Sequence, residues 1–351
     1  MSEQNSAATL AGPAPTGGQT PADKTPNAIS RMLGGSAGRS LGLVIALLAL
    51  FVVGTITAGD RFASFENVLT IIRFASIIGV ISIGMTFVIT AGGIDLSVGS
   101  VMGLATVVAT LSWVQDFATS TSWIVMVIVA LAVGAGAGLI NGIVIAYGNV
   151  VAFIATLAML VAARGLAEVL ANRTTQIVKE QGFLSAMRGD LIGVPILIWI
   201  FVIVVIAGWF LLNRTTFGRR TVAIGGNLEA ARLAGIKVKR HIMYVYVLAG
   251  LTAGIAAVMM LARTTAGTST HGTLYELDAI AAVVVGGTLL VGGRGTIMGT
   301  VLGVLIFSTL TNVFTQNNLS TSVQAIAKGA IIVAAVMLQQ RLANRSRSRK
   351  P

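Results

Sequence analysis

The chain has 351 residues, of which 55% are hydrophobic and only 10% are charged. A typical soluble domain carries about 25% charged residues, and a soluble protein of this size could not hide so much apolar surface from water. The composition therefore excludes an ordinary soluble domain and favours a membrane protein. The chain has no cysteine, which excludes disulfides and thiolate chemistry.

The N-terminal segment 1–38 is rich in Ala, Gly, Pro, Ser and Thr and shows no apolar period. Such a composition predicts a disordered tail. The first apolar run starts at Leu41, and no small-residue cleavage site clearly follows it. We interpret this run as a membrane anchor rather than a secretory signal. The predicted domains are this tail, a transmembrane domain at 39–340 and a basic tail at 341–351.

Ten apolar runs have roughly the 17–25 residues that cross a bilayer as a helix. The sequence therefore predicts an all-α, polytopic transmembrane bundle of about ten helices. The predicted spans are 41–58, 70–91, 97–114, 123–147, 150–170, 192–212, 243–262, 277–292, 296–314 and 323–338. The eighth is short and rich in Gly, so it is also compatible with a broken or re-entrant segment.

Basic residues predict the orientation, because short cytoplasmic loops collect Lys and Arg. The loop 213–241 and the tail after Leu338 are both strongly basic, and Arg31 and Arg39 precede the first span. With ten spans these regions fall on one side, so we expect both termini to be cytoplasmic. The net charge of +12 is then better explained by topology than by a nucleic-acid partner.

Glycines recur every four residues inside several predicted spans, a spacing that lets helix backbones approach closely in lipid. Bundle packing explains such stripes, and a smooth passage for a polar solute is the alternative. The stripes are Gly134, Gly138 and Gly142, then Gly250 and Gly254, then Gly295, Gly299 and Gly303.

The segment 91–100 separates two apolar runs and carries an acid. Gly92 and Gly93 break one helix, and Asp95 and Ser97 begin the next. Either polar side chain can cap the new helix by accepting from its free N–H groups. An acid between two membrane spans is costly and marks a functional candidate; simple capping at the membrane boundary is the alternative.

The basic loop 213–241 is expected to contain a short helix at 227–235. Asn227 is a suitable N-cap, Glu229 lies in the first turn where the helix dipole favours an acid, and Gly235 suits the left-handed position after the last turn. A helix of about two turns is too short to span a membrane. An ordinary interfacial helix is the alternative to a docking helix.

Two acids, Glu276 and Asp278, stand at the mouth of the eighth predicted span. They are candidates for a hydrated vestibule, or ordinary loop residues. No phosphate-binding loop motif is present, the two histidines are far apart, and no Ser/His/Asp set is credible. We therefore expect no catalytic residues, no metal site and no cofactor.

These segments together resemble the permease subunits of bacterial ABC importers for monosaccharides, the ribose, xylose, galactose and fructose group. The matching stretches are GGIDLSVGS at 92–100, FIATL at 153–157 with Arg164-Gly165, GxNxEAARLAGI at 225–236, YELDAIAAVVxGG at 275–287 and GGxG at 292–295. The resemblance covers about residues 40–340. Val151 and Ala152 depart from it, because many relatives have Pro before the Phe.

The resemblance implies a fold like that of type II ABC importers and a set of partners. These are a second permease copy, a cytoplasmic ATP-binding subunit, a periplasmic or lipid-anchored sugar-binding protein and the lipid of the bacterial cytoplasmic membrane. Segment 227–235 would be the coupling helix in the ATPase cleft, so ATP would be hydrolysed in another chain. The candidate coupling residues are Gly225, Asn227, Glu229, Ala230, Ala231, Arg232 and Gly235.

The candidate pathway or gate residues are Gly92, Gly93, Asp95, Ser97, Phe153, Glu276 and Asp278. The resulting expectation is a permease subunit that moves a pentose or hexose by alternating access, as one half of a dimer. The alternative is a secondary transporter of a small polar solute driven by an ion gradient, which would need intramembrane carboxylates or broken-helix ion sites.

Overall fold

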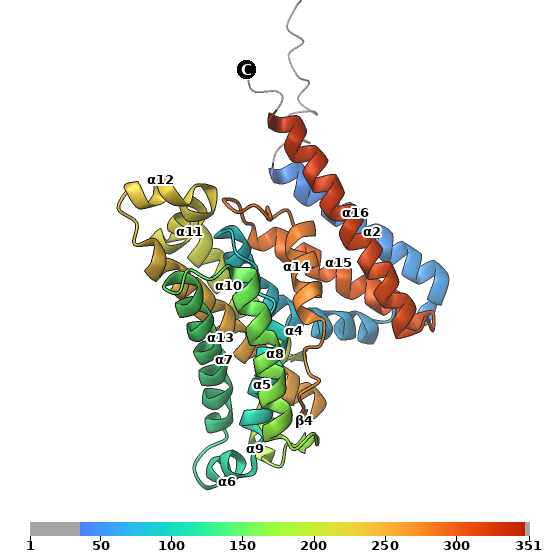
Figure 1. Cartoon of the computed structure of the whole chain (residues 1–351). Helices are drawn as coiled ribbons and strands as arrows, with labels where there is room; N and C mark the ends of the chain where they lie inside the picture. Colours follow the sequence, from blue (N-terminus) through green and yellow to red (C-terminus); the bar gives the residue numbers. More distant parts are fainter. Residues whose placement is uncertain (1–35, 348–351) are drawn as a thin grey trace, which may run out of the picture.

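The computed structural model describes residues 36–347, and the chain is almost entirely helical (Figure 1). Seven helices of this part are long and apolar enough to cross a membrane. They are α2 (Ser36–Ala58), α4 (Phe65–Thr90), α7 (Ile124–Ala146), α8 (Ala152–Leu170), α10 (Ile196–Arg214), α13 (Val238–Thr264) and α15 (Ile297–Gln316). An eighth span is formed if α5 (Val98–Ala109) and α6 (Ser112–Ser120), bent by 58°, are counted together.

The remaining elements are one long C-terminal helix and several short pieces. The helices are α3 (Asp60–Ala63), α9 (Gln181–Arg188), α11 (Thr216–Gly226), α12 (Leu228–Leu233), α14 (Tyr275–Val285) and α16 (Thr321–Arg347). The strands pair antiparallel in two small ladders: β1 (Gln176–Ile177) with β4 (Ala266–Gly267), and β2 (Asp190–Leu191) with β3 (Val194–Pro195).

The all-α bundle predicted from the sequence is confirmed, with differences at three of the ten predicted spans. Seven predicted spans match the seven helices above, and the span at 97–114 is the bent α5–α6 pair. The span at 277–292 is wrong as a continuous helix: α14 ends at Val285, and Gly287, Gly292 and Gly293 have positive φ, which makes a loop instead. The segment 323–338 lies inside α16.

The predicted tails also differ from the structure where they are described. Helix α2 begins at Ser36, so residues 36–38 are helical rather than disordered. The helix α16 continues to Arg347, so most of the segment 341–351 extends a helix. The rest of the predicted N-terminal tail, 1–35, and residues 348–351 lie outside the described residues.

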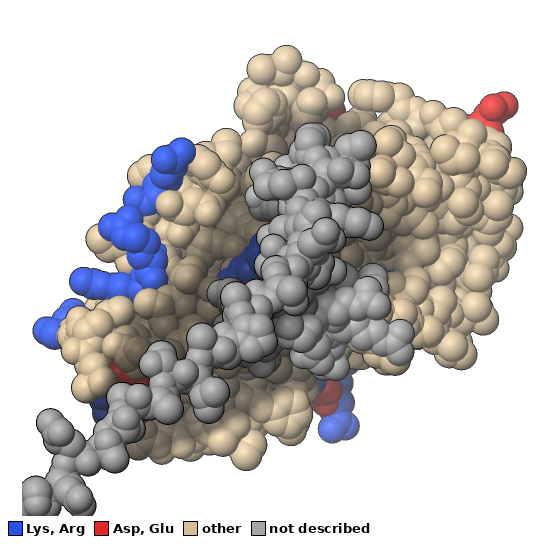
Figure 2. Space-filling model, turned by 90° about the horizontal axis from the view of Figure 1, so that it is seen from above, with Lys and Arg blue, Asp and Glu red and all other residues tan. Residues whose placement is uncertain are grey.

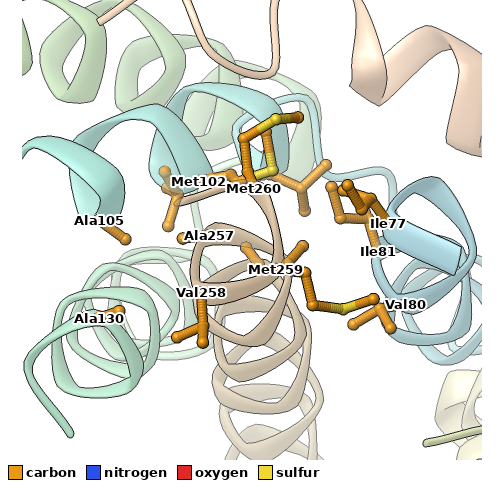
Figure 3. Packing of buried hydrophobic residues seen from close by; sticks show 14 of the residues in the cluster. Ile77, Val80, Ile81, Met102, Ala105, Ala130, Ala257, Val258, Met259 and Met260 are labelled. Carbon is orange, nitrogen blue, oxygen red and sulfur yellow. The ribbon is translucent and has the colours of Figure 1, made fainter. Parts of the chain in front are cut away.

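The core of the molecule surrounds α13, most of whose length is buried. Side chains from three helices converge on it in Figure 3: Ile77 and Ile81 from α4, Met102 from α5 and Ala130 from α7. Met259 points toward the α4 side chains. A helix that is surrounded by other helices must be apolar around its whole circumference. This explains why α4 and α13 show no polar face.

The glycine stripes pack helices together. A Cβ added at Gly138 would collide with the backbone of Tyr246 on α13, and a Cβ at Gly142 would lie 2.8 Å from the Cα of Met243. Gly250 and Gly134 face each other in the same way, so α7 and α13 touch through their backbones. The packing explanation of the stripes is therefore the one that the structure supports.

The two ends of the bundle carry different elements (Figure 1). We call one the α12 end, which holds α11, α12 and the C-terminal end of α16, and the other the α9 end, which holds α6, α9 and β4. Seen from above, Lys and Arg side chains gather along one side of the α12 end (Figure 2). Loop 213–241 supplies seven basic residues to this end: Arg214, Arg219, Arg220, Arg232, Lys237, Lys239 and Arg240.

Candidate functional site

Three glycine pairs that are far apart in the sequence meet at the α12 end. We call them the glycine junction: Gly92 and Gly93 after α4, Gly225 and Gly226 at the end of α11, and Gly292 and Gly293 between α14 and α15. The N–H of Gly293 donates to the carbonyl of Thr90 at 2.9 Å. A Cβ at Gly225 would collide with that carbonyl and would lie 2.6 Å from the nitrogen of Gly293. The three backbones are thus in direct contact.

Positive φ angles explain why glycine ends the helices here. Gly92 has φ +87°, Gly292 has φ +83° and Gly293 has φ +77°. Residues other than glycine rarely adopt such values. A Cβ at Gly292 would also lie 2.9 Å from the Cα of Gly92. Both requirements, conformation and close approach, point to the same residue type. Two of the three sequence motifs are therefore helix breaks that touch each other.

Asp95 is buried immediately after the first break, with a relative exposure of 1%. Its Oδ1 accepts from the backbone N–H of Ser97 at 2.8 Å and from the Ser97 hydroxyl at 2.6 Å. The amide of Asn141 on α7 donates to the same hydroxyl at 2.9 Å. Burial raises the pKa of the Asp95 carboxyl, and the hydrogen bonds from Ser97 oppose that rise. The Asp95 carboxyl thus closes a turn at Ser97, the N-cap residue of α5, and no side chain accepts from the first N–H groups of that helix.

Tyr246 on α13 was not predicted as a site residue. Its hydroxyl is buried without a hydrogen-bond partner among the described residues. A Cβ at Gly93 would lie 2.5 Å from this oxygen, so the phenol is aimed at the first break. The sequence of an apolar helix does not indicate an unpaired hydroxyl, because a Tyr in a membrane helix can pack through its ring or form a hydrogen bond through its hydroxyl.

Glu276 faces the first turn of α5 from the other side. Its Oε2 is buried without a hydrogen-bond partner and would touch a Cβ at Gly99. Arg164 on α8 lies close enough to attract it, and donates to the carbonyls of Ser269 and, at 2.9 Å, His271. Two acids therefore flank the N-terminal end of α5, where the helix dipole favours negative charge.

His271 belongs to the loop between β4 and α14. Its Nδ1 lies 3.3 Å from the hydroxyl of Thr106 on α5. Burial, and next the charges of Arg164 and Arg263, lower the pKa of His271 to about 4. The ring is therefore neutral at neutral pH and joins the loop to α5 by packing and hydrogen bonding.

The structure separates the last two predicted gate residues from these groups. Asp278 pairs with Lys328 at 3.1 Å, which ties α14 to α16. Phe153 is 49% exposed on α8, although the next turn of that helix reaches the first break through Thr156, whose hydroxyl donates to the carbonyl of Ile94 at 3.3 Å.

The predicted helix at 227–235 is present as α12, with its predicted cap. The Asn227 side chain accepts from the N–H of Ala230 at 2.9 Å, and Gly235 has φ +79° just after the helix. Ala231 is buried. Glu229 and Arg232 form an exposed pair at 3.8 Å, which adds little stability.

The helix α11, which the sequence did not predict, holds α12 against the bundle. The Thr215 hydroxyl caps it by accepting from the N–H of Gly218 at 3.3 Å. Thr221 bonds to His241 on α13 at 2.8 Å, and the rings of Phe217 and His241 lie 4.5 Å apart. The helix α11 ends at the glycine junction, where the backbone of Gly225 lies against Thr90 and Gly293. Within residues 36–347, no three His, Asp or Glu side chains gather as metal ligands.

Comparison with known proteins identifies what the chain is similar to. Residues 67–336 match the family described as "Branched-chain amino acid transport system / permease component". The ribose import permease protein RbsC of Escherichia coli (strain K12) is 39% identical over 85% of this chain and 92% of its own length. The RbsC protein of Bacillus subtilis (strain 168) is 40% identical over 86% and 93%.

A relative with a different named sugar is the L-arabinose ABC transporter permease protein AraH of Azospirillum brasilense. It is 35% identical over 88% of this chain and 90% of its own length. No solved structure matches the chain.

Proposed function

The chain belongs to the permease family that matches residues 67–336, and we propose that it is the membrane-spanning subunit of an ATP-driven monosaccharide importer. The observation that carries the substrate class is the agreement among relatives: proteins named for ribose, L-arabinose and xylose import align with 84–88% of the chain. The family description names amino acids, but these individual relatives at 33–40% identity are named for pentoses.

The α12 end is proposed as the cytoplasmic docking face for the ATP-binding subunit. Its basic residues favour the cytoplasm by the positive-inside rule, which would place both termini there. Leu233 is 88% exposed and Leu228 is exposed as well, although both lie in a polar loop. Exposed leucines on a short helix outside the apolar spans suit a protein partner.

Coupling is proposed to pass through the glycine junction. When the ATP-binding subunits close, α12 and α11 move together, and the backbone of Gly225 presses on Thr90 and Gly293. The two helix breaks then shift, and with them the first turn of α5 that Asp95 and Glu276 flank. No catalytic set is needed in this chain, because ATP hydrolysis belongs to the partner.

The other partners are assigned to the remaining surfaces. The exposed apolar face of α8, which includes Phe153, Leu157 and Val161, is proposed to meet a second permease copy across the pathway. The α9 end is proposed to receive the sugar-binding protein that supplies selectivity.

The test is uptake of radiolabelled ribose, L-arabinose and xylose by cells or vesicles that contain the chain with its ATP-binding and sugar-binding partners. Uptake of at least one pentose should require ATP hydrolysis and should survive collapse of the proton gradient. Uptake that persists without the ATP-binding subunit and stops when the gradient collapses would establish the ion-driven alternative instead.

The docking assignment has its own variant. Glu229→Arg should weaken co-purification of the ATP-binding subunit and reduce uptake, because it reverses a charge on α12. The control is Asp116→Arg, which reverses an exposed acid on α6 at the opposite end. If co-purification survives Glu229→Arg as well as it survives the control, α12 is not the docking helix.

A further inference from the structure

A cavity of about 370 Å³ lies between α4, α10 and α13, toward the α9 end. Three arginines from three elements line it: Arg73 on α4, Arg188 at the end of α9 and Arg263 in the last turn of α13. The apolar part of the lining includes Phe74 and Leu197. The chain has only 12 acidic residues, and only 10% of its residues are charged. Three of its arginines nevertheless surround this one cavity.

None of the three guanidinium groups forms an ion pair with an acid of the described chain, whose ion pairs involve Arg173, Arg232 and Lys328. The acid nearest in sequence, Asp190, faces Pro195 across the β2–β3 hairpin but does not line the cavity. Three like charges repel one another, so the arrangement is most stable with an anion between them. Arg also forms bidentate hydrogen bonds with phosphate oxygens.

Arg263 is held in place without an acid. Its guanidinium carbon lies 3.5 Å from the centroid of the Phe74 ring, a cation–π contact. The side chain of Tyr275 on α14 lies close to the same group. The group is thus pre-oriented at the rim. Arg73 and Arg188 are exposed and make no ion pair or cation–π contact within residues 36–347. One oriented donor and two further donors therefore surround the opening.

The cavity lies beside the ends of two predicted spans, α10 and α13, where hydrocarbon gives way to polar headgroups. Helix α10 begins at Ile196 and α13 ends at Thr264, so Leu197 and Arg263 lie within one turn of the ends of two spans. Phe74 is 38% exposed on the side of α4. Acyl chains can therefore contact the apolar lining while a headgroup reaches the arginines.

We propose that this cavity binds the phosphate headgroup of an anionic phospholipid. A neutral sugar gives no reason for three unpaired guanidinium groups, whereas a phosphodiester attached to two acyl chains matches both the charge and the apolar lining. The site is separate from the glycine junction and does not depend on the transported substrate.

The test is native mass spectrometry of the purified, delipidated transporter titrated with three probes. These are phosphatidylglycerol, a diacylglycerol-linked neutral sugar lipid without phosphate, and inorganic phosphate. The variant is Arg73→Gln with Arg188→Gln, which removes two exposed charges and keeps the Arg263–Phe74 packing. The control is Arg61→Gln with Lys179→Gln, two exposed basic residues outside the cavity that form no ion pair within residues 36–347.

The expected result is one tightly bound phosphatidylglycerol per chain. The cavity variant should weaken this binding by about tenfold or more, because each Arg that is replaced removes charge-assisted hydrogen bonds to the phosphate; the control should weaken it by less than about twofold. The neutral lipid should bind the wild type no better than the variant. Equal loss in variant and control would overturn the site, and displacement of the lipid by inorganic phosphate would overturn the lipid as its ligand.

Discussion

The two helix breaks that meet at the glycine junction are sealed in different ways. In the first, Asp95 and Ser97 close the gap with buried side chains, and Asn141 supports them from α7. In the second, backbone groups make most of the bonds: Leu289 donates to the carbonyl of Arg294 at 3.0 Å and Gly292 to that of Leu289 at 2.9 Å. The side chain of Thr288 also accepts from the N–H of Thr296 at 3.3 Å. Hydrogen bonds made by side chains can be removed by substituting the residue that makes them. Hydrogen bonds made by the backbone can be disturbed only by changing the space around the backbone.

The largest effect is expected where one residue touches both breaks. Gly225→Ala should reduce uptake by more than about tenfold, because its Cβ would collide with the Thr90 carbonyl and crowd Gly293, and overpacking typically costs about 1–3 kcal/mol. The measurement is ATP-dependent uptake at matched expression. Gly226→Ala is the control, since its Cβ would meet nothing closer than the Cα of Gly293 at 3.9 Å. Equal uptake by the two variants would contradict backbone coupling.

A smaller effect is expected from the side-chain seal itself. Asp95→Ala should lower the apparent free energy of unfolding by about 1–3 kcal/mol, because the buried N–H of Ser97 loses its acceptor. Asp95→Asn keeps an acceptor oxygen and should lose less. Denaturant unfolding in detergent measures both. An Asn variant as unstable as the Ala variant would mean that the charge, and not the acceptor, seals the first break.

The second break ends in a helix cap that can be removed separately. The Thr296 hydroxyl accepts from the N–H of Gly299 at 3.1 Å, so Thr296→Ala should cost about 1 kcal/mol. Thr296→Ser keeps the hydroxyl and serves as the control. The same unfolding measurement applies. If Thr296→Ala costs as much as Asp95→Ala, the second break relies on side chains as heavily as the first.

The smallest effect is expected at Tyr246. Its buried hydroxyl has no partner in the described chain, so Tyr246→Phe removes an unsatisfied group and should leave stability unchanged or raise it by up to about 1 kcal/mol. A thermal unfolding comparison with wild type measures this. A clear loss of stability or uptake would show that the hydroxyl acquires a partner at the first break during the transport cycle.

Local signals in the sequence predicted local structure well. The Asn227 cap and the glycine at 235 define α12, because a cap and a left-handed terminus depend on a few neighbouring residues. Apolar length located seven spans for the same reason. The segment 277–292 is not a continuous helix, because Gly287 and Gly292 turn the chain after α14; its glycines had indicated the alternative of a broken segment, which is the one that the structure has.

Contacts between distant segments could not be predicted from one sequence. Nothing in the spacing of Gly92, Gly225 and Gly292 indicates that they meet, since their separation in the chain exceeds any helical period. The proximity of Arg164 to Glu276 and the ion pair of Lys328 with Asp278 were missed for the same reason: contacts across helices depend on tertiary packing. The roles assigned to the gate and coupling residues remain predictions that the variants above examine.

The backbone contact between α7 and α13 has a mechanical consequence. Helices separated by a layer of side chains can slide as rotamers change, but Gly134, Gly138 and Gly250 leave no such layer between these two. We expect the two helices to move as one rigid unit. Because α13 starts at Val238, five residues after α12 ends at Leu233, the proposed displacement of α12 would reach this unit at the tip of α13 and be carried along it across the thickness of the bilayer.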